Sequence, residues 1–160
     1  NESAINKAKK YAKIFRRDLN LRNIELEQKF DLIICYHVIE HLKNPKNLMK
    51  NIIKYLKKDK YLIIGTPDFD SAMARLFGDK FRLLHDKTHI SLFSVDSLTR
   101  FLRDNGFSII SIDYPYFETD YFNKNKILDV FNNKGYSPPF YGNVFTILAK
   151  KNSYFSLFTV

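Results

Sequence analysis

FDLIICY, residues 30–36, is a nearly continuous apolar run with the length of one β-strand. Such runs are typical of strands that are buried on both faces, as in parallel sheets covered by helices. YLIIGTP, residues 61–67, is a second run of the same kind, and its glycine and proline bring it to an end. Together the two stretches predict an α/β fold built around a parallel sheet.

Further elements are expected on either side of these runs. Helices are predicted over 2–12, from Pro45, around 72–77 and from Ser94 to Asn105, and strands over 13–19, 107–117 and 143–151. Asp59 and Lys60 are expected to form the turn before the second apolar run. Because no helix is expected between the last two strands, the final strand should run antiparallel to its neighbour.

Composition limits the classes of protein that the chain can belong to. It has 160 residues, 45% of them apolar, which suits one globular domain. The net charge is +9, but the lysines are spread along predicted helices, so no nucleic-acid partner is expected. The single cysteine, Cys35, lies in an apolar run and is expected to be a packing residue. Short apolar runs and the lack of a signal peptide predict a cytoplasmic protein without a membrane span.

The order of the segments resembles a known family. FDLIICYHVIEHLKNPKNLMKNI, residues 30–52, resembles the fourth strand and following helix of class I S-adenosylmethionine-dependent methyltransferases, in the branch that carries a "vleHl" segment. YLIIGTP is similar to the fifth strand, HISLFSVDSLTRFLRDNGF to the next linker and helix, and PPFYGNVFTILAKK to the final antiparallel strand. The resemblance implies a Rossmann-like sheet over residues 1–152, followed by an apolar tail at 153–160.

No segment of this sequence resembles the first two strands of the family. NESAINKAKKYA, residues 1–12, resembles the helix after the second strand, so the first two strands and the glycine-rich cofactor loop are expected to lie before Asn1. Without those strands, two apolar strand edges would be exposed, a feature that proteins usually cover. We therefore expect a fragment of a longer protein, or a chain whose edges are covered by a second copy or a partner.

The resemblance also implies which residues face the cofactor, S-adenosylmethionine. Asp18 and Leu19 resemble the "D-L" pair after the third strand, where the carboxylate accepts from the adenine amino group. Tyr36 and His37 end the fourth strand, at the edge of the sheet where such folds bind their ligands. These four residues are the predicted cofactor-binding set.

Three histidines are candidates for the methyl-acceptor side of the site. His41 follows the fourth strand and could act as a general base or orient the acceptor, or it could be a packing residue at a helix start. His85 and His89 lie in the segment that flanks the substrate pocket in the family, so one of them is expected to contact the acceptor. Their spacing of four would suit a metal on a helix, but with no third ligand apparent, no metal is expected.

The predicted function is methyl transfer from S-adenosylmethionine to an oxygen or nitrogen of a small molecule: a sugar, a lipid precursor or a metabolite. The alternative is a non-catalytic remnant or subunit that keeps this half of the fold as an interaction module. A weaker third hypothesis, an RNA methyltransferase, depends on the net charge alone.

Overall fold

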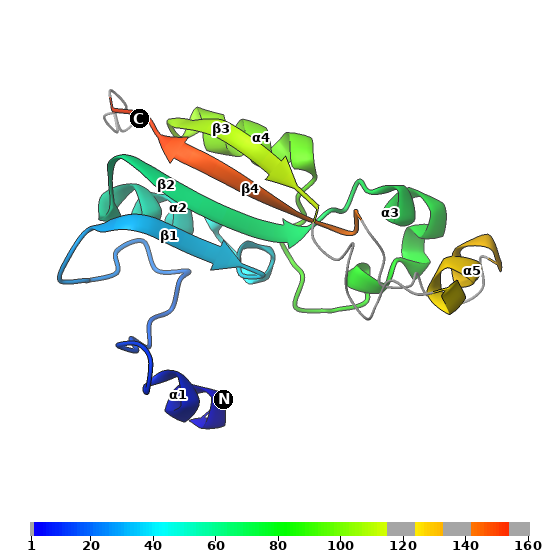
Figure 1. Cartoon of the computed structure of the whole chain (residues 1–160), viewed down its shortest axis with the longest axis horizontal. Coiled ribbons are helices and arrows are strands. Elements are labelled where there is room, and N and C mark those ends of the chain that lie inside the picture. Colours follow the sequence, from blue (N-terminus) through cyan, green and yellow to red (C-terminus); the bar gives the residue numbers. More distant parts are fainter. Residues whose placement is uncertain (1, 115–123, 133–141, 154–160) are drawn as a thin grey trace.

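A four-stranded sheet forms the centre of the molecule (Figure 1). The computed structural model describes residues 2–114, 124–132 and 142–153. The strands are β1 (Phe30–Tyr36), β2 (Leu56–Pro67), β3 (Phe107–Asp113) and β4 (Val144–Lys151), in the spatial order β1-β2-β4-β3. β1 and β2 are parallel, and β4 lies antiparallel between β2 and β3. The predicted α/β sheet with an antiparallel last strand is therefore confirmed.

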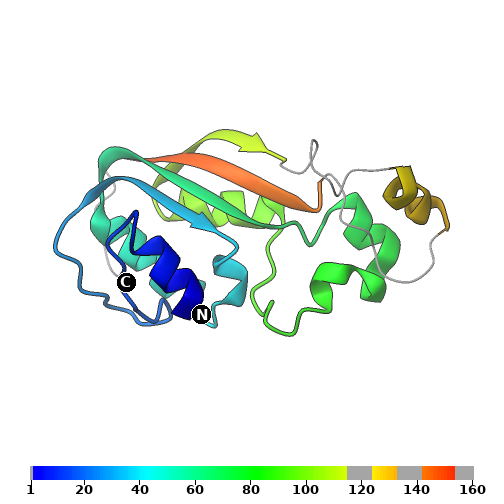
Figure 2. The same ribbon diagram turned by 60° about the horizontal axis from the view of Figure 1, so that its bottom comes forward.

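Helices cover one face of this sheet and lie beyond one of its ends. They are α1 (Glu2–Ala8), α2 (Pro45–Tyr55), α3 (Ala72–Phe77), α4 (Val95–Asp104) and α5 (Lys124–Asn132), with short 3₁₀ turns at Ile39–His41, Gly78–Lys80 and Arg82–Leu84. Figure 2 shows α2 and α4 on the same side of the strands. The carboxyl ends of β1, β2 and β3 point toward α3 (Figure 1). As predicted, Ser94 is the N-cap of α4, and a reciprocal capping box with Ser97 satisfies backbone groups there.

The main core fills the space between the sheet and these two helices. Its fully buried members include Leu62, Ile64, Leu98, Leu102, Phe145 and Ile147. Cys35 belongs to it, and burial raises the pKa of its thiol to about 12, so it is a packing residue as expected.

The other face of β1 is bare. Leu32, Ile34 and Tyr36 are 46%, 57% and 49% exposed, so the prediction that this strand is buried on both faces was wrong. The reason is that α2 and α4 lie on one side of the sheet. In the part of the chain that the structure describes, β1 is also an edge strand, as expected from the resemblance.

Three other sequence predictions need correction. Residues 13–19 form no strand, because a strand needs a neighbour for its backbone hydrogen bonds and this segment pairs with none of the described strands. Asp59 and Lys60 lie inside β2, where the register against β1 jumps and Asp59 takes a φ of +58°. The helix α5 lies between β3 and β4, where none was predicted. Of the apolar tail, residues 154–160 lie outside the described part.

Lys151, at the end of β4, donates hydrogen bonds to the backbone where α2 ends and β2 begins. Its Nζ donates to the carbonyl oxygens of Ile53 and Leu56 at 2.7 and 2.8 Å, and the residue is buried. Burial, and then the charges of Lys29 and Lys58, lower the pKa of this amine.

We expect Lys151→Met to lower the free energy of unfolding by about 1–3 kcal/mol, because two carbonyls at this junction lose their hydrogen-bond donor. Urea unfolding followed by circular dichroism measures this change. Lys150→Met is the matched control, since the half-buried Lys150 pairs with the exposed Asp59 and its loss should cost less than about 0.5 kcal/mol. Equal costs for the two variants would contradict the structural role of Lys151.

Candidate functional site

The chain turns sharply where β1 ends. His37 adopts a φ of +50°, in the left-handed region, and its backbone N–H donates to the carbonyl of Gly65 on β2 at 2.9 Å. The 3₁₀ turn Ile39–His41 follows, and it buries Glu40 completely while leaving His41 half-buried. The Glu40 carbonyl accepts from the amides of Ile90 and Ser91 at 2.8 and 3.0 Å, which joins the distant 89–91 segment to this turn.

The Glu40 carboxylate is held by hydrogen bonds on both oxygens. His37 Nδ1 lies 3.1 Å from Oε1, and the hydroxyl of Thr66, at the end of β2, donates to Oε2 at 3.1 Å. Burial alone would raise the pKa of this carboxyl, but the hydrogen bonds of His37, of its own backbone amide and of Thr66 lower it below its usual value. A negative charge is therefore placed inside the protein at the carboxyl end of the sheet.

His41 and His89 lie beside this carboxylate, with their ring centroids 4.8 Å apart. His41 Nδ1 is 3.1 Å from the carbonyl of Thr88, and His89 Nδ1 is 2.7 Å from the carbonyl of Leu83. Because a carbonyl oxygen can only accept, both Nδ1 atoms must carry hydrogen. When the rings are neutral, each Nε2 therefore keeps a lone pair.

Glu40, His41 and His89 form what we call the carboxyl-end cluster, in which one donor atom from each residue lies within 4.8 Å of the others. Two of the three predicted acceptor-side histidines are thus brought together. His85 is exposed on the same loop and is not a member of the cluster. Glu40 and Thr66 were not predicted from the sequence, although the position of Glu40 directly before His41 was a usable signal.

The predicted cofactor residues fall in two places. Tyr36 and His37 lie at the carboxyl end of β1, close to Gly65 of the neighbouring strand. Asp18 and Leu19 lie on the segment that precedes β1. Asp18 is exposed, and its Oδ1 accepts from the backbone and side-chain nitrogens of Asn20. A carboxylate has four lone pairs, so Asp18 can still accept from an amino group.

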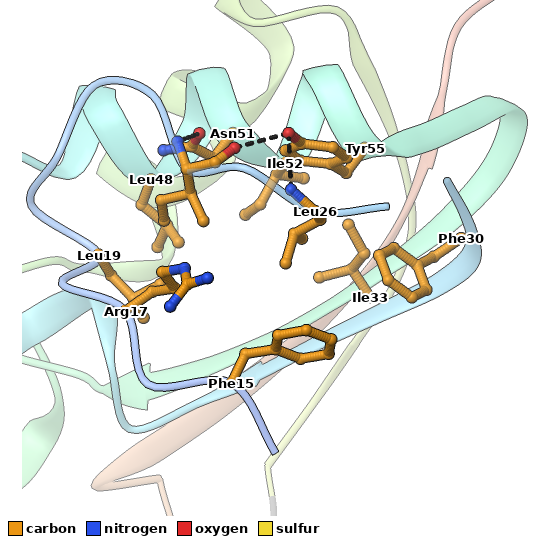
Figure 3. A pocket seen from close by; sticks show the side chains of 11 residues that line it. Phe15, Arg17, Leu19, Leu26, Phe30, Ile33, Leu48, Asn51, Ile52 and Tyr55 are labelled. Carbon is orange, nitrogen blue, oxygen red and sulfur yellow. Dashed lines mark hydrogen bonds between the residues drawn. The ribbon is translucent and has the colours of Figure 1, made fainter. Parts of the chain in front are cut away.

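Leu19 borders an apolar cavity of about 320 Å³ between the 15–26 segment, β1 and α2 (Figure 3). The side chains of Asn51 and Tyr55, on α2, line one side of the cavity and hold the 15–26 segment in place through four hydrogen bonds. The Asn51 amide donates to the carbonyl of Leu21 and accepts from the backbone N–H of Ile24, each at 3.0 Å. The Tyr55 hydroxyl donates to the carbonyl of Ile24 at 2.6 Å and accepts from the backbone N–H of Leu26 at 3.1 Å. The cavity follows β1 from Phe30 to Ile33, so Tyr36 and His37 do not line it.

The arrangement defines a class of protein: an α/β sheet with polar side chains gathered at the carboxyl ends of its parallel strands, where such folds bind ligands. A family model described as "Methyltransferase domain" matches residues 2–112. This match covers more than half of the chain, and the chain belongs to the methyltransferase domain family.

Relatives and solved structures agree with that assignment. A ubiquinone biosynthesis O-methyltransferase of Coxiella burnetii is 26% identical over 124 residues, covering 70% of this chain and 53% of the relative. A SAM-dependent methyltransferase of Thermotoga maritima superposes with a TM-score of 0.64 at 19% identity, covering 94% of this chain and 70% of that one. Another from Archaeoglobus fulgidus gives 0.59 at 20% identity, covering 94% and 73%. The likeness to the solved structures shows the fold, and the chain spans about half of the length of the first curated relatives.

None of the helices in the described ranges is long and apolar enough to cross a lipid bilayer.

Proposed function

We propose that this chain forms part of an S-adenosylmethionine-dependent methyltransferase that modifies an oxygen or nitrogen of a small molecule, such as a sugar, a lipid precursor or a metabolite. The observation that carries the proposal is the carboxyl-end cluster beside Tyr36 and His37, in a chain of the methyltransferase domain family. The proposal is also supported by a magnesium protoporphyrin IX methyltransferase of Synechocystis with bound SAH, which has the same fold at a TM-score of 0.57 and 15% identity, covering 94% of this chain and 57% of that one.

The described residues fit one end of the cofactor. Asp18 offers an acceptor for the adenine amino group, and the half-exposed ring of Tyr36 offers an apolar surface at the carboxyl end of β1. S-adenosylmethionine supplies an electrophilic methyl group on a sulfonium, and the sulfur keeps the bonding electron pair when the acceptor oxygen or nitrogen bonds to that methyl. On the protein side, the free Nε2 of His41 can receive the proton that the acceptor loses, and His89 helps to orient the acceptor.

A methyl-transfer assay of the full-length protein with radiolabelled S-adenosylmethionine, screened over phenols, sugars and amines, tests the proposal. Label transferred to a small acceptor supports it. Label transferred only to RNA would contradict the small-molecule proposal and support the RNA-methyltransferase alternative. In that case RNA binding should also weaken steeply with salt.

The bare face and free edge of β1 favour a second candidate, a non-catalytic interaction module. Exposed apolar side chains on an edge strand are typical of a surface that another chain covers. Calorimetry of the full-length protein with S-adenosylmethionine separates the two candidates. Micromolar binding would contradict the module, whereas a folded or oligomeric chain without binding would support it.

Gly65 gives a sharper test of the role proposed for Tyr36. A Cβ at position 65 would lie 2.5 Å from Cδ1 of the Tyr36 ring, so the ring must move in Gly65→Ala. Because an aromatic contact is worth about 0.5–1.5 kcal/mol, we expect S-adenosylhomocysteine to bind the full-length variant roughly 3- to 10-fold more weakly.

Tyr36→Ala provides the matched comparison for calorimetry. It should weaken binding by a similar factor, and the double variant should be no weaker than Tyr36→Ala alone, because both changes act on one ring. Wild-type affinity in Tyr36→Ala would remove that residue from the cofactor site.

A further inference from the structure

The donor set of the carboxyl-end cluster is that of a metal centre. Two imidazoles and one carboxylate are ligands that proteins use for zinc and related divalent ions, often with a fourth position open to water or substrate. The sequence alone suggested only the pair His85 and His89, with no third ligand apparent. The structure instead groups His89 with His41 and Glu40, which come from two segments almost fifty residues apart.

Both histidines are arranged as metal-binding histidines usually are. In metal sites the second ring nitrogen commonly donates to a backbone carbonyl or carboxylate, which fixes the ring and its tautomer. His41 and His89 each make this bond through Nδ1, to the carbonyls of Thr88 and Leu83, which leaves Nε2 for a ligand. The Asp86 carboxylate lies 3.6 Å from Nε2 of His89, so this nitrogen already faces a negative charge. The side chain of His89 is only 8% exposed, so few orientations are open to it.

Glu40 supplies the negative charge that a divalent cation requires. Its carboxylate is fully buried, at the carboxyl end of the sheet. The hydrogen bonds to His37 and Thr66 use two of its four lone pairs, which orients the group and leaves lone pairs for a metal.

The distances are compatible with one ion. Ligand bonds of about 2.0–2.1 Å place neighbouring donors of a tetrahedral zinc site about 3.4 Å apart. The donor atoms of the cluster lie within 4.8 Å of one another. The set must therefore contract from this spacing when it closes around a cation.

We propose that Glu40, His41 and His89 bind one divalent transition-metal ion of the zinc type. Imidazole donors favour zinc or cobalt over magnesium, which prefers oxygen ligands. The metal site itself does not depend on methyl transfer. One consequence does rest on the proposed function: the ion would lower the pKa of a bound acceptor hydroxyl, and His41 would then be a ligand in place of a base.

Titration of the metal-free 160-residue chain with Zn²⁺ by calorimetry, and with Co²⁺ by visible absorption, tests the site without cofactor or acceptor. We expect one ion per chain, with micromolar or tighter affinity, a cobalt spectrum typical of nitrogen and oxygen ligands, and weak or no Mg²⁺ binding. His41→Ala, His89→Ala and the isosteric Glu40→Gln should each weaken Zn²⁺ binding at least 100-fold. Far-UV circular dichroism establishes that each variant is folded.

His85→Ala is the matched control, because it removes an exposed histidine of the same loop that lies outside the cluster. Its Zn²⁺ affinity should equal that of the wild type. Absence of Zn²⁺ binding to the folded wild-type chain would overturn the proposal. So would equal affinities in the wild type and in folded His41→Ala and His89→Ala, or a loss of binding in His85→Ala as large as in the cluster variants. A failed methyl-transfer assay with intact metal binding would count against the proposed function alone.

Discussion

His41→Ala in the full-length protein is expected to lower kcat for methyl transfer by about 10²- to 10⁴-fold, the usual contribution of one positioned acid–base or polarising group. Cofactor affinity should change little, because the proposed function assigns His41 to the acceptor, and assigns Tyr36 at the end of β1 and His37 just after it to the cofactor. Single-turnover kinetics and calorimetry with S-adenosylhomocysteine measure the two quantities separately. A wild-type rate in this variant would remove His41 from the mechanism.

His85→Ala is the control for this experiment as well. The two histidines lie on neighbouring surface segments, but only His41 belongs to the carboxyl-end cluster. A rate near that of the wild type is therefore expected for His85→Ala. A loss as large as that of His41→Ala would show that the acceptor reaches the exposed loop and not the cluster.

Metal removal separates the two roles open to His41. If its Nε2 is a proton acceptor, a chelator leaves the wild-type rate unchanged. If it is a metal ligand, chelation reduces the wild-type rate toward that of His41→Ala, and added Zn²⁺ restores the wild type but not the variant. The same imidazole cannot hold a metal and accept a proton through one lone pair, so the two outcomes exclude each other.

The sequence predicted the apolar strands and the cap of α4 because each depends on local chemistry. β1 and the second half of β2 follow apolar runs, and Ser94 caps α4 because its hydroxyl accepts from the backbone N–H of Ser97. Residues 13–19 were different. Their β-leaning composition cannot form a strand without a neighbouring strand, and composition alone contains no information on that neighbour.

The candidate site was predicted in part for a similar reason. His41 could be selected because it closely follows a strand, and His89 because its segment resembles the one that flanks the substrate pocket in the family. The inward orientation of Glu40 depends on the 3₁₀ turn after β1. It also depends on the backbone amides of residues 90 and 91, which donate to the Glu40 carbonyl from a distant segment. No periodic pattern encodes a contact of that kind, so the three-residue cluster emerged only from the structure.

The one-sided burial of the sheet gives the largest expected effect on stability. Ile64 on β2 is fully buried in the main core, whereas Ile34 on the adjacent β1 is 57% exposed on the opposite face. We expect Ile64→Ala to lower the free energy of unfolding of the 160-residue chain by about 2–5 kcal/mol, through lost burial and the cavity left behind. Ile34→Ala, the same chemical change one strand away, should cost less than about 1 kcal/mol.

Urea unfolding of both variants at two protein concentrations tenfold apart makes this comparison a test of what covers β1. If the face is bare in solution, the cost at Ile34 stays small at both concentrations. A cost that rises with concentration would mean that a second copy covers Leu32 and Ile34, because association stabilises only the folded state. A cost equal to that of Ile64→Ala at both concentrations would contradict the one-sided core, since two buried isoleucines in one sheet should lose similar free energy on truncation.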